Sequence, residues 1–171
     1  KHDIKPILGC ELNVCSDHTV SSREAQHLVV LASSQRGYEN LVKLTSLGWV
    51  EGYANGKPRI DLEQLAAHRE GLVGLSACMG GYLAQEVLMK GEAAGRAAMA
   101  RLRDCFEPGQ FFVELQDHGF VEQKPLNEIL VDLAREFGLP LVASNDCHYL
   151  EQKNSQAQMV LQCIASGTSL T

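Results

Sequence analysis

The sequence GLPLVASNDCHYL, residues 138 to 150, contains both the end of a helix and the start of a polar site. Gly138 and Pro140 are residues that stop a helix, and the apolar run after them predicts a short buried strand. Asp146 and His148 follow that strand. Because residues two apart face the same side of an extended chain, both side chains can reach one ion, or two neighbouring ions.

The same alternation of strand and helix signals runs back along the chain. Strands are predicted in the β-rich runs KPILGCELNV, HLVVLAS, GLVGLSA, FFVELQD and LPLVAS, which cover residues 5–14, 27–33, 71–77, 111–117 and 139–144. Helical spacing predicts helices at Tyr38 to Val50, Leu62 to His68, Tyr82 to Met89, Glu92 to Phe106, Val121 to Phe137 and Ser155 to Ala165. This order predicts an α/β fold with a mostly parallel sheet and flanking helices.

Composition limits the class of protein. The 171 residues, 45% of them hydrophobic, are enough for one domain with a sizeable core, and the net charge of −6 argues against a surface that mainly grips phosphates. No apolar run approaches the roughly 20 residues that span a bilayer, so no membrane contact and a cytoplasmic location are expected. The six cysteines form no CxxC pair, which predicts reduced thiols.

Metal-competent residues stand at the predicted carboxyl ends of the strands, where the chemistry of parallel α/β folds collects. They are Glu11, Cys78, Glu114 with His118, and Asp146 with His148. His27 instead begins its strand. The short connection from Cys15 to Gln26 allows an antiparallel strand there, which would bring His27 to the same rim.

Each of these residues also has an ordinary structural interpretation. A single strand-end histidine such as His27 is more often structural than a ligand, a free cysteine such as Cys78 is a common core residue, and Glu11 fits the outward face of a strand. The Asp-x-His pair is the most informative signal. Its oxygen and nitrogen donors suit Zn, Mn or Fe, and a Cys78 ligand would favour Zn or Fe.

These segments together resemble a known family. The runs KPILGCELNV, HLVVLASSQRGYENLVKL, GLVGLSACMGG, FFVELQDHG, LNEILVDLAREFGLPLVASNDCHYL and VLQCIASGTSL look like the PHP (polymerase and histidinol phosphatase) domain, in the form found in the alpha subunit of bacterial DNA polymerase III. The resemblance extends from end to end, with matching order and spacing.

The resemblance implies a distorted (β/α)7 barrel whose rim holds up to three divalent ions for phosphoester hydrolysis, in some alpha subunits as a 3′ to 5′ exonuclease. The implied metal ligands are Glu11, His27, Cys78, Asp146 and His148, with Glu11, Asp146 and His148 closest to the catalysis. Glu114 and His118 match family positions that we expect to support a ligand by hydrogen bonding rather than to bind metal themselves.

One departure from the family pattern matters. The family opens with a His-x-His strand and a second unit bearing another histidine, and the sequence here begins after both. We therefore interpret residues 1–171 as a single, partial PHP domain that contains the last five strands of the barrel. It would hold metal weakly or in part, and its first strand would lie at an open edge. Ile7, Leu8 and Leu12 would then be covered by a partner, by the missing units or by a second copy of the chain.

Three classes of function remain open. The first is a metal-dependent phosphoesterase within a polymerase that acts on DNA. The second is a scaffold that stabilises the rest of the alpha subunit and docks a proofreading exonuclease subunit without catalysis of its own. The third is a PHP-family small-molecule phosphatase. The segments GYENLVKL and VLQCIASGTSL favour a polymerase, either the replicative alpha subunit or its error-prone relative.

Overall fold

A computed structural model of the chain describes residues 3–170 and contains one five-stranded sheet. Its strands lie in chain order: β1 (Gly9–Val14), β2 (Gln26–Ala32), β3 (Leu72–Leu75), β4 (Phe111–Leu115) and β5 (Leu141–Ala143). β2 pairs antiparallel with both β1 and β3, while β3, β4 and β5 pair in parallel. Four of the five strands therefore run in one direction and β2 runs against them, which is the direction that the short connection from Cys15 to Gln26 allowed.

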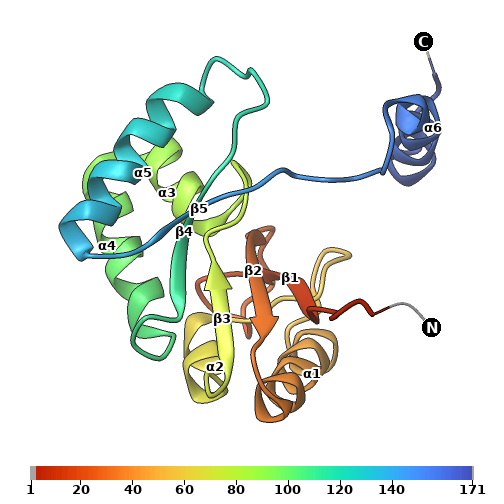
Figure 1. The fold of residues 1–171 in the computed structure, drawn as a ribbon. Coiled ribbons are helices and arrows are strands. Elements are labelled where there is room, and N and C mark those ends of the chain that lie inside the picture. The colour runs from red at the N-terminus through yellow and green to blue at the C-terminus, as the bar shows by residue number, and fades with distance from the viewer. Residues whose placement is uncertain (1–2, 171) are drawn as a thin grey trace.

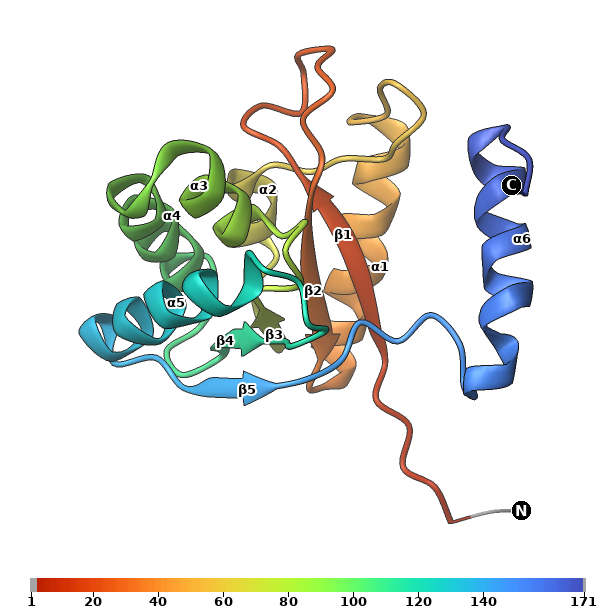
Figure 2. The same ribbon diagram turned by 90° about the horizontal axis from the view of Figure 1, so that it is seen from above.

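Within residues 3–170 six α-helices accompany the sheet, and all six were predicted from the sequence with ends that differ by a few residues. They are α1 (Gln35–Val50), α2 (Leu62–Ala67), α3 (Tyr82–Lys90), α4 (Glu92–Asp104), α5 (Gln123–Phe137) and α6 (Ser155–Ser166), with a 3₁₀ turn η1 at Gln152–Asn154. Figures 1 and 2 show α1 and α2 beside β1 to β3, and α3 to α5 gathered beside β4 and β5. None of the described helices is both long and apolar enough to cross a membrane.

Local signals explain several helix ends. The Ser34 side chain accepts a hydrogen bond from the Gly37 N–H and caps α1. Asp61 and Gln64 form a capping box at α2. Gly138 ends α5 in the left-handed conformation, as its place before Pro140 predicted.

The core lies on the helix-covered face of the sheet. The ladder places Leu12 opposite Leu28, and Cys10 opposite Val30, so these four side chains share that face. The alternate residues Glu11, Val29 and Leu75 face the other side and are less deeply buried. The five strands form an open sheet that does not close around this second face, which agrees with a partial PHP-type barrel.

The edge of β1 is partly covered by the chain itself. The Cys15 N–H donates to the Ile60 carbonyl and the Ile60 N–H to the Asn13 carbonyl, so a short segment pairs with the end of this strand. Leu12 is accordingly only 6% exposed within the chain's own core, and the prediction that a partner covers it is wrong. Ile7 and Leu8 remain 73% and 51% exposed, as expected for residues that this chain does not cover.

Helix α6 stands apart from the rest of the fold. From β5 the chain crosses the rim at which β3 and β4 also end, and it then reaches α6 at a distance from the sheet (Figures 1 and 2). None of the α6 residues is buried, and its exposed apolar side chains are Met159, Val160, Leu161 and Ile164. The strand β5 was predicted to be buried, and that prediction is wrong: as the last strand of the sheet it is exposed or half-buried, with Leu141 45% exposed. The segment that carries Asp146 and His148 thus leads from an edge strand to a helix without buried residues.

Candidate metal centre

Glu11, His27 and Cys78 lie together at the rim. The ladder pairs Glu11 with Val29 and Asn13 with His27, which turns Glu11 and His27 to the same open face. His27 Nδ1 lies 3.4 Å from Glu11 Oε1 and 3.8 Å from the Cys78 sulfur. The Glu11 carboxylate and the Cys78 thiol therefore both lie near one ring nitrogen of His27.

A sharp turn after β3 presents Cys78. Ala77 has a φ of 67°, in the left-handed region, and the Gly81 N–H donates to the Cys78 carbonyl. The His27 N–H donates to the Gly80 carbonyl at 3.0 Å, which ties the start of β2 to this turn. Burial raises the pKa of the Cys78 thiol, and the nearby charges of Asp146 and Glu11 add to the rise.

Asp146 and His148 form a second group, on the segment after β5. His148 Nδ1 lies 3.7 Å from Asp146 Oδ1 and 2.9 Å from the Asp146 carbonyl oxygen. The two side chains also line an open concavity together with His118 and the α6 residue Gln162. The Asp-x-His spacing thus brings these side chains side by side, although the chain is bent rather than extended at His148.

Glu114 connects the turns on which both groups depend. Its buried carboxylate accepts hydrogen bonds from the Ala77 N–H at 3.0 Å and from the Gln116 amide at 3.2 Å, and it also contacts the Ser144 hydroxyl. Ala77 precedes Cys78, and Ser144 lies two residues before Asp146. Glu114 therefore fixes the backbone next to two candidate ligands, which is the arrangement expected of a residue that supports ligands.

The structure brings the five predicted ligands into two groups rather than one. Among residues 3–170, no hydrogen bond or ion pair joins Glu11, His27 and Cys78 to Asp146 and His148. Both groups lie at the rim where the parallel strands end, and the Asp146 charge is near enough to the Cys78 thiol to contribute to its raised pKa. Metal binding by these residues stays a prediction.

A third cluster was missed by sequence reasoning. Within the described part of the chain, Asp17, His18 and Asp61 offer three metal-competent atoms within 4.8 Å of one another. Each carboxylate already has partners. The Asp17 carboxylate accepts from the Thr19 N–H and hydroxyl, which lowers the pKa of Asp17, while Asp61 contacts His18 Nδ1 and caps α2. We interpret this cluster as the anchor of a loop, because its oxygens are engaged within the chain.

The pKa of Asp61 reflects these contacts. Burial acts to raise it, but the hydrogen bonds from the Gln64 N–H and from His18, with the His18 charge, outweigh burial and lower the pKa. Asp61 followed by Gln64 is a capping-box signal that a reader of the sequence could have found. The contact with His18, 43 residues away, could not have been found in that way.

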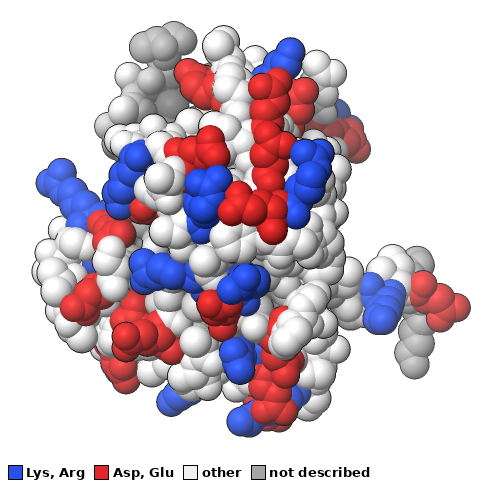
Figure 3. Space-filling view, turned by 90° about the vertical axis from the view of Figure 1, so that its left-hand side faces the viewer, with Lys and Arg blue, Asp and Glu red and all other residues white. Residues whose placement is uncertain are grey.

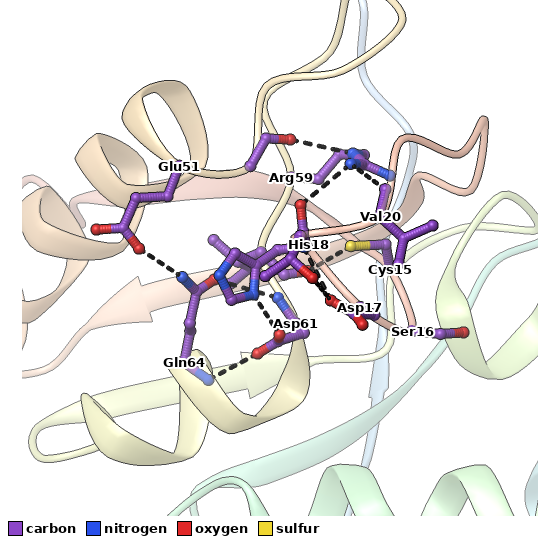
Figure 4. Close-up of polar contacts among 12 residues, drawn as sticks. Cys15, Ser16, Asp17, His18, Val20, Glu51, Arg59, Asp61 and Gln64 are labelled. Carbon is purple, nitrogen blue, oxygen red and sulfur yellow. Dashed lines mark hydrogen bonds and ion pairs between the residues drawn. The ribbon is translucent and has the colours of Figure 1, made fainter.

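A buried arginine holds the predicted surface loop Ser16 to Gln26 in place (Figure 4). Arg59 is 2% exposed, and its guanidinium donates to the carbonyl oxygens of His18, Val20 and Ser22, to the Ser22 hydroxyl and to the Gly52 carbonyl. No carboxylate takes part in these five hydrogen bonds. The connection between β1 and β2 is therefore fixed in shape, although it looks like an ordinary polar loop in the sequence.

The donor set at the rim fits divalent ions. Zn and the other first-row ions bind carboxylate, neutral imidazole and thiolate, and all three types occur in the Glu11, His27 and Cys78 group. A ligand histidine needs one ring nitrogen with a free lone pair, while the other nitrogen donates to an acceptor. His148 meets this requirement, because its Nδ1 faces a carbonyl oxygen and leaves Nε2 free.

The fold and the rim together define a mixed α/β domain with metal-competent side chains at the ends of its strands. The chain belongs to the PHP domain family, since the model of that family, described as "PHP domain", matches residues 1–118. Divalent metal ions are the cofactors that membership implies, and the donor set above is compatible with them. Asp146 and His148 lie beyond the matched range.

The curated relatives are similar to the whole chain. DNA polymerase III subunit alpha of Treponema pallidum is 42% identical over 170 residues, which are 95% of this chain and 14% of that protein. The subunits of Thermus aquaticus and Borreliella burgdorferi are 37% and 36% identical, over 98% of this chain and 14% and 15% of theirs. The chain thus spans about one seventh of the length of these relatives.

Proposed function

We propose that this chain is a partial PHP domain of a bacterial DNA polymerase III alpha subunit, in which its rim binds divalent ions and hydrolyses phosphoesters as a 3′ to 5′ exonuclease. The contact between Glu11, His27 and Cys78 supports the site most directly, because these residues come from two strands and a turn that are far apart in the sequence. The similarity to alpha subunits along the whole chain supports the parent protein. The polymerase reaction, the DNA contact and the cytoplasmic location follow from that parent.

The chemistry of the site follows from its side chains. Divalent ions bound at such a rim supply a water of lowered pKa and neutralise phosphate charge. The Glu11 and Asp146 carboxylates provide the negative charge that holds such ions. His27 and His148 provide neutral nitrogen donors, and His148 is oriented by its hydrogen bond to the Asp146 carbonyl. Cys78 keeps its proton at neutral pH, given its raised pKa, until it binds a cation.

The charge distribution supports local chemistry rather than a broad nucleic-acid surface. The face over α3 to α5 interleaves basic and acidic side chains (Figure 3). On that face Arg96 pairs with Glu136 and Glu92, and Lys90 pairs with Glu86. Because these cations are already paired, DNA would be held by the remainder of the alpha subunit, with its 3′ end at the rim.

A scaffold role is the second candidate. The observation that favours it is the separation of the candidate ligands into two groups that no hydrogen bond or ion pair joins within residues 3–170. A domain that only stabilises the polymerase, or docks a proofreading exonuclease subunit, could keep such a rim without using it. A small-molecule phosphatase receives less support, since the relatives named above are all polymerase subunits.

The Asp146→Asn substitution separates the two candidates in the full-length protein. It removes a ligand charge, so an active site would lose bound metal and release nucleotides from a DNA 3′ end at least about tenfold more slowly. Asp132→Asn is the matched control, because Asp132 is an exposed aspartate that pairs only with Arg135 on α5. Unchanged metal content and nucleotide release in Asp146→Asn would refute the catalytic proposal and favour the scaffold.

The open edge of β1 also supports a proposed partner. Ile7 and Leu8 are exposed beside a strand whose outer edge is paired only near Asn13 and Cys15. Two copies of the 171-residue chain could pair through this edge where no longer polypeptide covers it. Sedimentation of the chain with and without an Ile7→Lys substitution tests this, and a monomer at all concentrations would exclude self-association.

A further inference from the structure

Gln123, at the start of α5, has its side-chain amide fixed by the backbone around it. The residue is 3% exposed, and its Oε1 accepts hydrogen bonds from the His118 N–H at 2.7 Å and from the Phe120 N–H at 3.4 Å. Backbone N–H groups can only donate, so the oxygen of this amide must face them. The NH₂ group of Gln123 has to face the other way.

That NH₂ group points at the imidazole of His118. Gln123 Nε2 lies 3.1 Å from His118 Nδ1, and an amide nitrogen can only donate. Nδ1 must therefore accept with its lone pair. A neutral imidazole with an unprotonated Nδ1 carries its proton on Nε2, so the buried glutamine sets the tautomer of an exposed histidine.

His148, which lines the same concavity, has the opposite arrangement. Its Nδ1 lies 2.9 Å from the carbonyl oxygen of Asp146, which can only accept, so Nδ1 carries the proton and Nε2 keeps its lone pair. The two neutral imidazoles thus differ at Nε2. His118 Nε2 carries a proton and can donate a hydrogen bond, whereas His148 Nε2 has a lone pair that can bind a metal ion.

We infer that Gln123 is a positioning residue that holds His118 as the Nε2–H tautomer, so that His118 donates a hydrogen bond at the rim and does not bind metal. One contact opposes this assignment: the Asp146 N–H points at His118 Nε2 at 3.4 Å, and a protonated Nε2 cannot accept its hydrogen bond. It is the weaker of the two His118 contacts, and Asp146 lies on an exposed segment, so this contact gives way rather than the buried amide.

The acceptor for the His118 Nε2–H is an oxygen that enters the same concavity, either a carboxylate oxygen or a non-bridging phosphate oxygen. Asp146 and His148 line this concavity together with His118. A donor at that place would orient a phosphoester without taking a coordination position. This role in the reaction rests on the proposed function, whereas the tautomer does not.

Nitrogen-15 NMR of the imidazole rings in the metal-free protein tests the inference without any activity measurement. At a pH where both rings are neutral, His118 should show an unprotonated Nδ1 and a protonated Nε2, and His148 should show the reverse. The Gln123→Glu variant keeps an oxygen for the two backbone N–H groups and places an acceptor at Nδ1. It should therefore reverse the His118 tautomer and leave that of His148 unchanged.

Gln162→Glu is the matched control, because Gln162 lines the same concavity as His118 and its substitution by glutamate adds the same charge as Gln123→Glu. It should leave His118 as in the unmodified protein. A protonated Nδ1 on His118 in the unmodified protein would overturn the inference, as would a His118 tautomer that stays the same in Gln123→Glu. Loss of nuclease activity in another variant would bear on the proposed function and not on this result.

Discussion

Replacing Arg59 with methionine should destabilise the protein and release the loop Ser16 to Gln26. The guanidinium donates five hydrogen bonds. Hydrogen bonds to a charged group contribute about 1.5–3 kcal/mol each, which would give a sum near 10 kcal/mol. Two effects reduce it. Burying a charge without a carboxylate costs several kcal/mol in the native state, and the freed carbonyl groups of a surface loop can turn to water.

The expected net loss in the free energy of unfolding is therefore about 3 kcal/mol, measured by urea denaturation. Hydrogen exchange should show the amides of the loop losing protection while those of β3 and β4 keep theirs. Arg135→Met is the control, since Arg135 is exposed and pairs only with Asp132, and it should change stability by less than about 1 kcal/mol. If Arg59→Met costs less than about 1 kcal/mol and loop exchange is unchanged, the guanidinium does not hold the loop.

Three further predictions concern packing, pH and thiol chemistry. Gly37→Ala should lower the free energy of unfolding by about 1–3 kcal/mol, because a Cβ there would lie 1.9 Å from the Gly71 carbonyl oxygen. Gly48→Ala on the same helix is the control: its Cβ meets nothing closer than 3.5 Å, and the change should raise the free energy of unfolding by up to about 1 kcal/mol. Because its pKa is lowered in the folded protein, ionised Asp61 stabilises the native state above the ordinary aspartate pKa. This contribution is lost as the pH falls through the folded-state pKa. In Asp61→Asn the free energy of unfolding should therefore fall less steeply below about pH 4 than in the unmodified protein. Iodoacetamide at neutral pH should label the exposed Cys147 in the native protein and the buried Cys105 only after unfolding, because burial raises the pKa of Cys105 to about 11. Mass spectrometry that finds Cys105 labelled first would contradict this.

The strands and helices could be predicted because their signals are local. Hydrophobic spacing and the Gly138 to Pro140 stop located the described α-helices and strands. The short connection after Cys15 allowed the reversed direction of β2 but did not decide it. The first strand was predicted from Lys5, but it begins at Gly9. Leu8 still accepts a hydrogen bond from the Ala32 N–H, but residues 5–7 lie beyond the end of β2 at Ala32 and have no strand to pair with.

What the sequence could not predict depends on contacts between distant residues. Leu12 was expected to need a partner, but Pro58 to Ile60 turns back to the end of β1 and helps to enclose the core there. Two further contacts, Arg59 with the His18 carbonyl and His18 with Asp61, join residues about 40 positions apart. Hydrophobic periodicity carries no information about such contacts. The family resemblance supplied Glu11, His27 and Cys78 as a set, and the antiparallel ladder explains why they meet.

The segment from Ser144 to His148 is held firmly at one end only. Ser144 contacts the buried Glu114, whereas the other end continues to α6, a helix in which no residue is buried. A partner that packs on α6 would therefore act on the segment that carries Asp146. We expect the distance between Asp146 and Glu11 to differ between the free domain and a complex in which α6 is covered, and a pair of spin labels on the two segments would measure that difference.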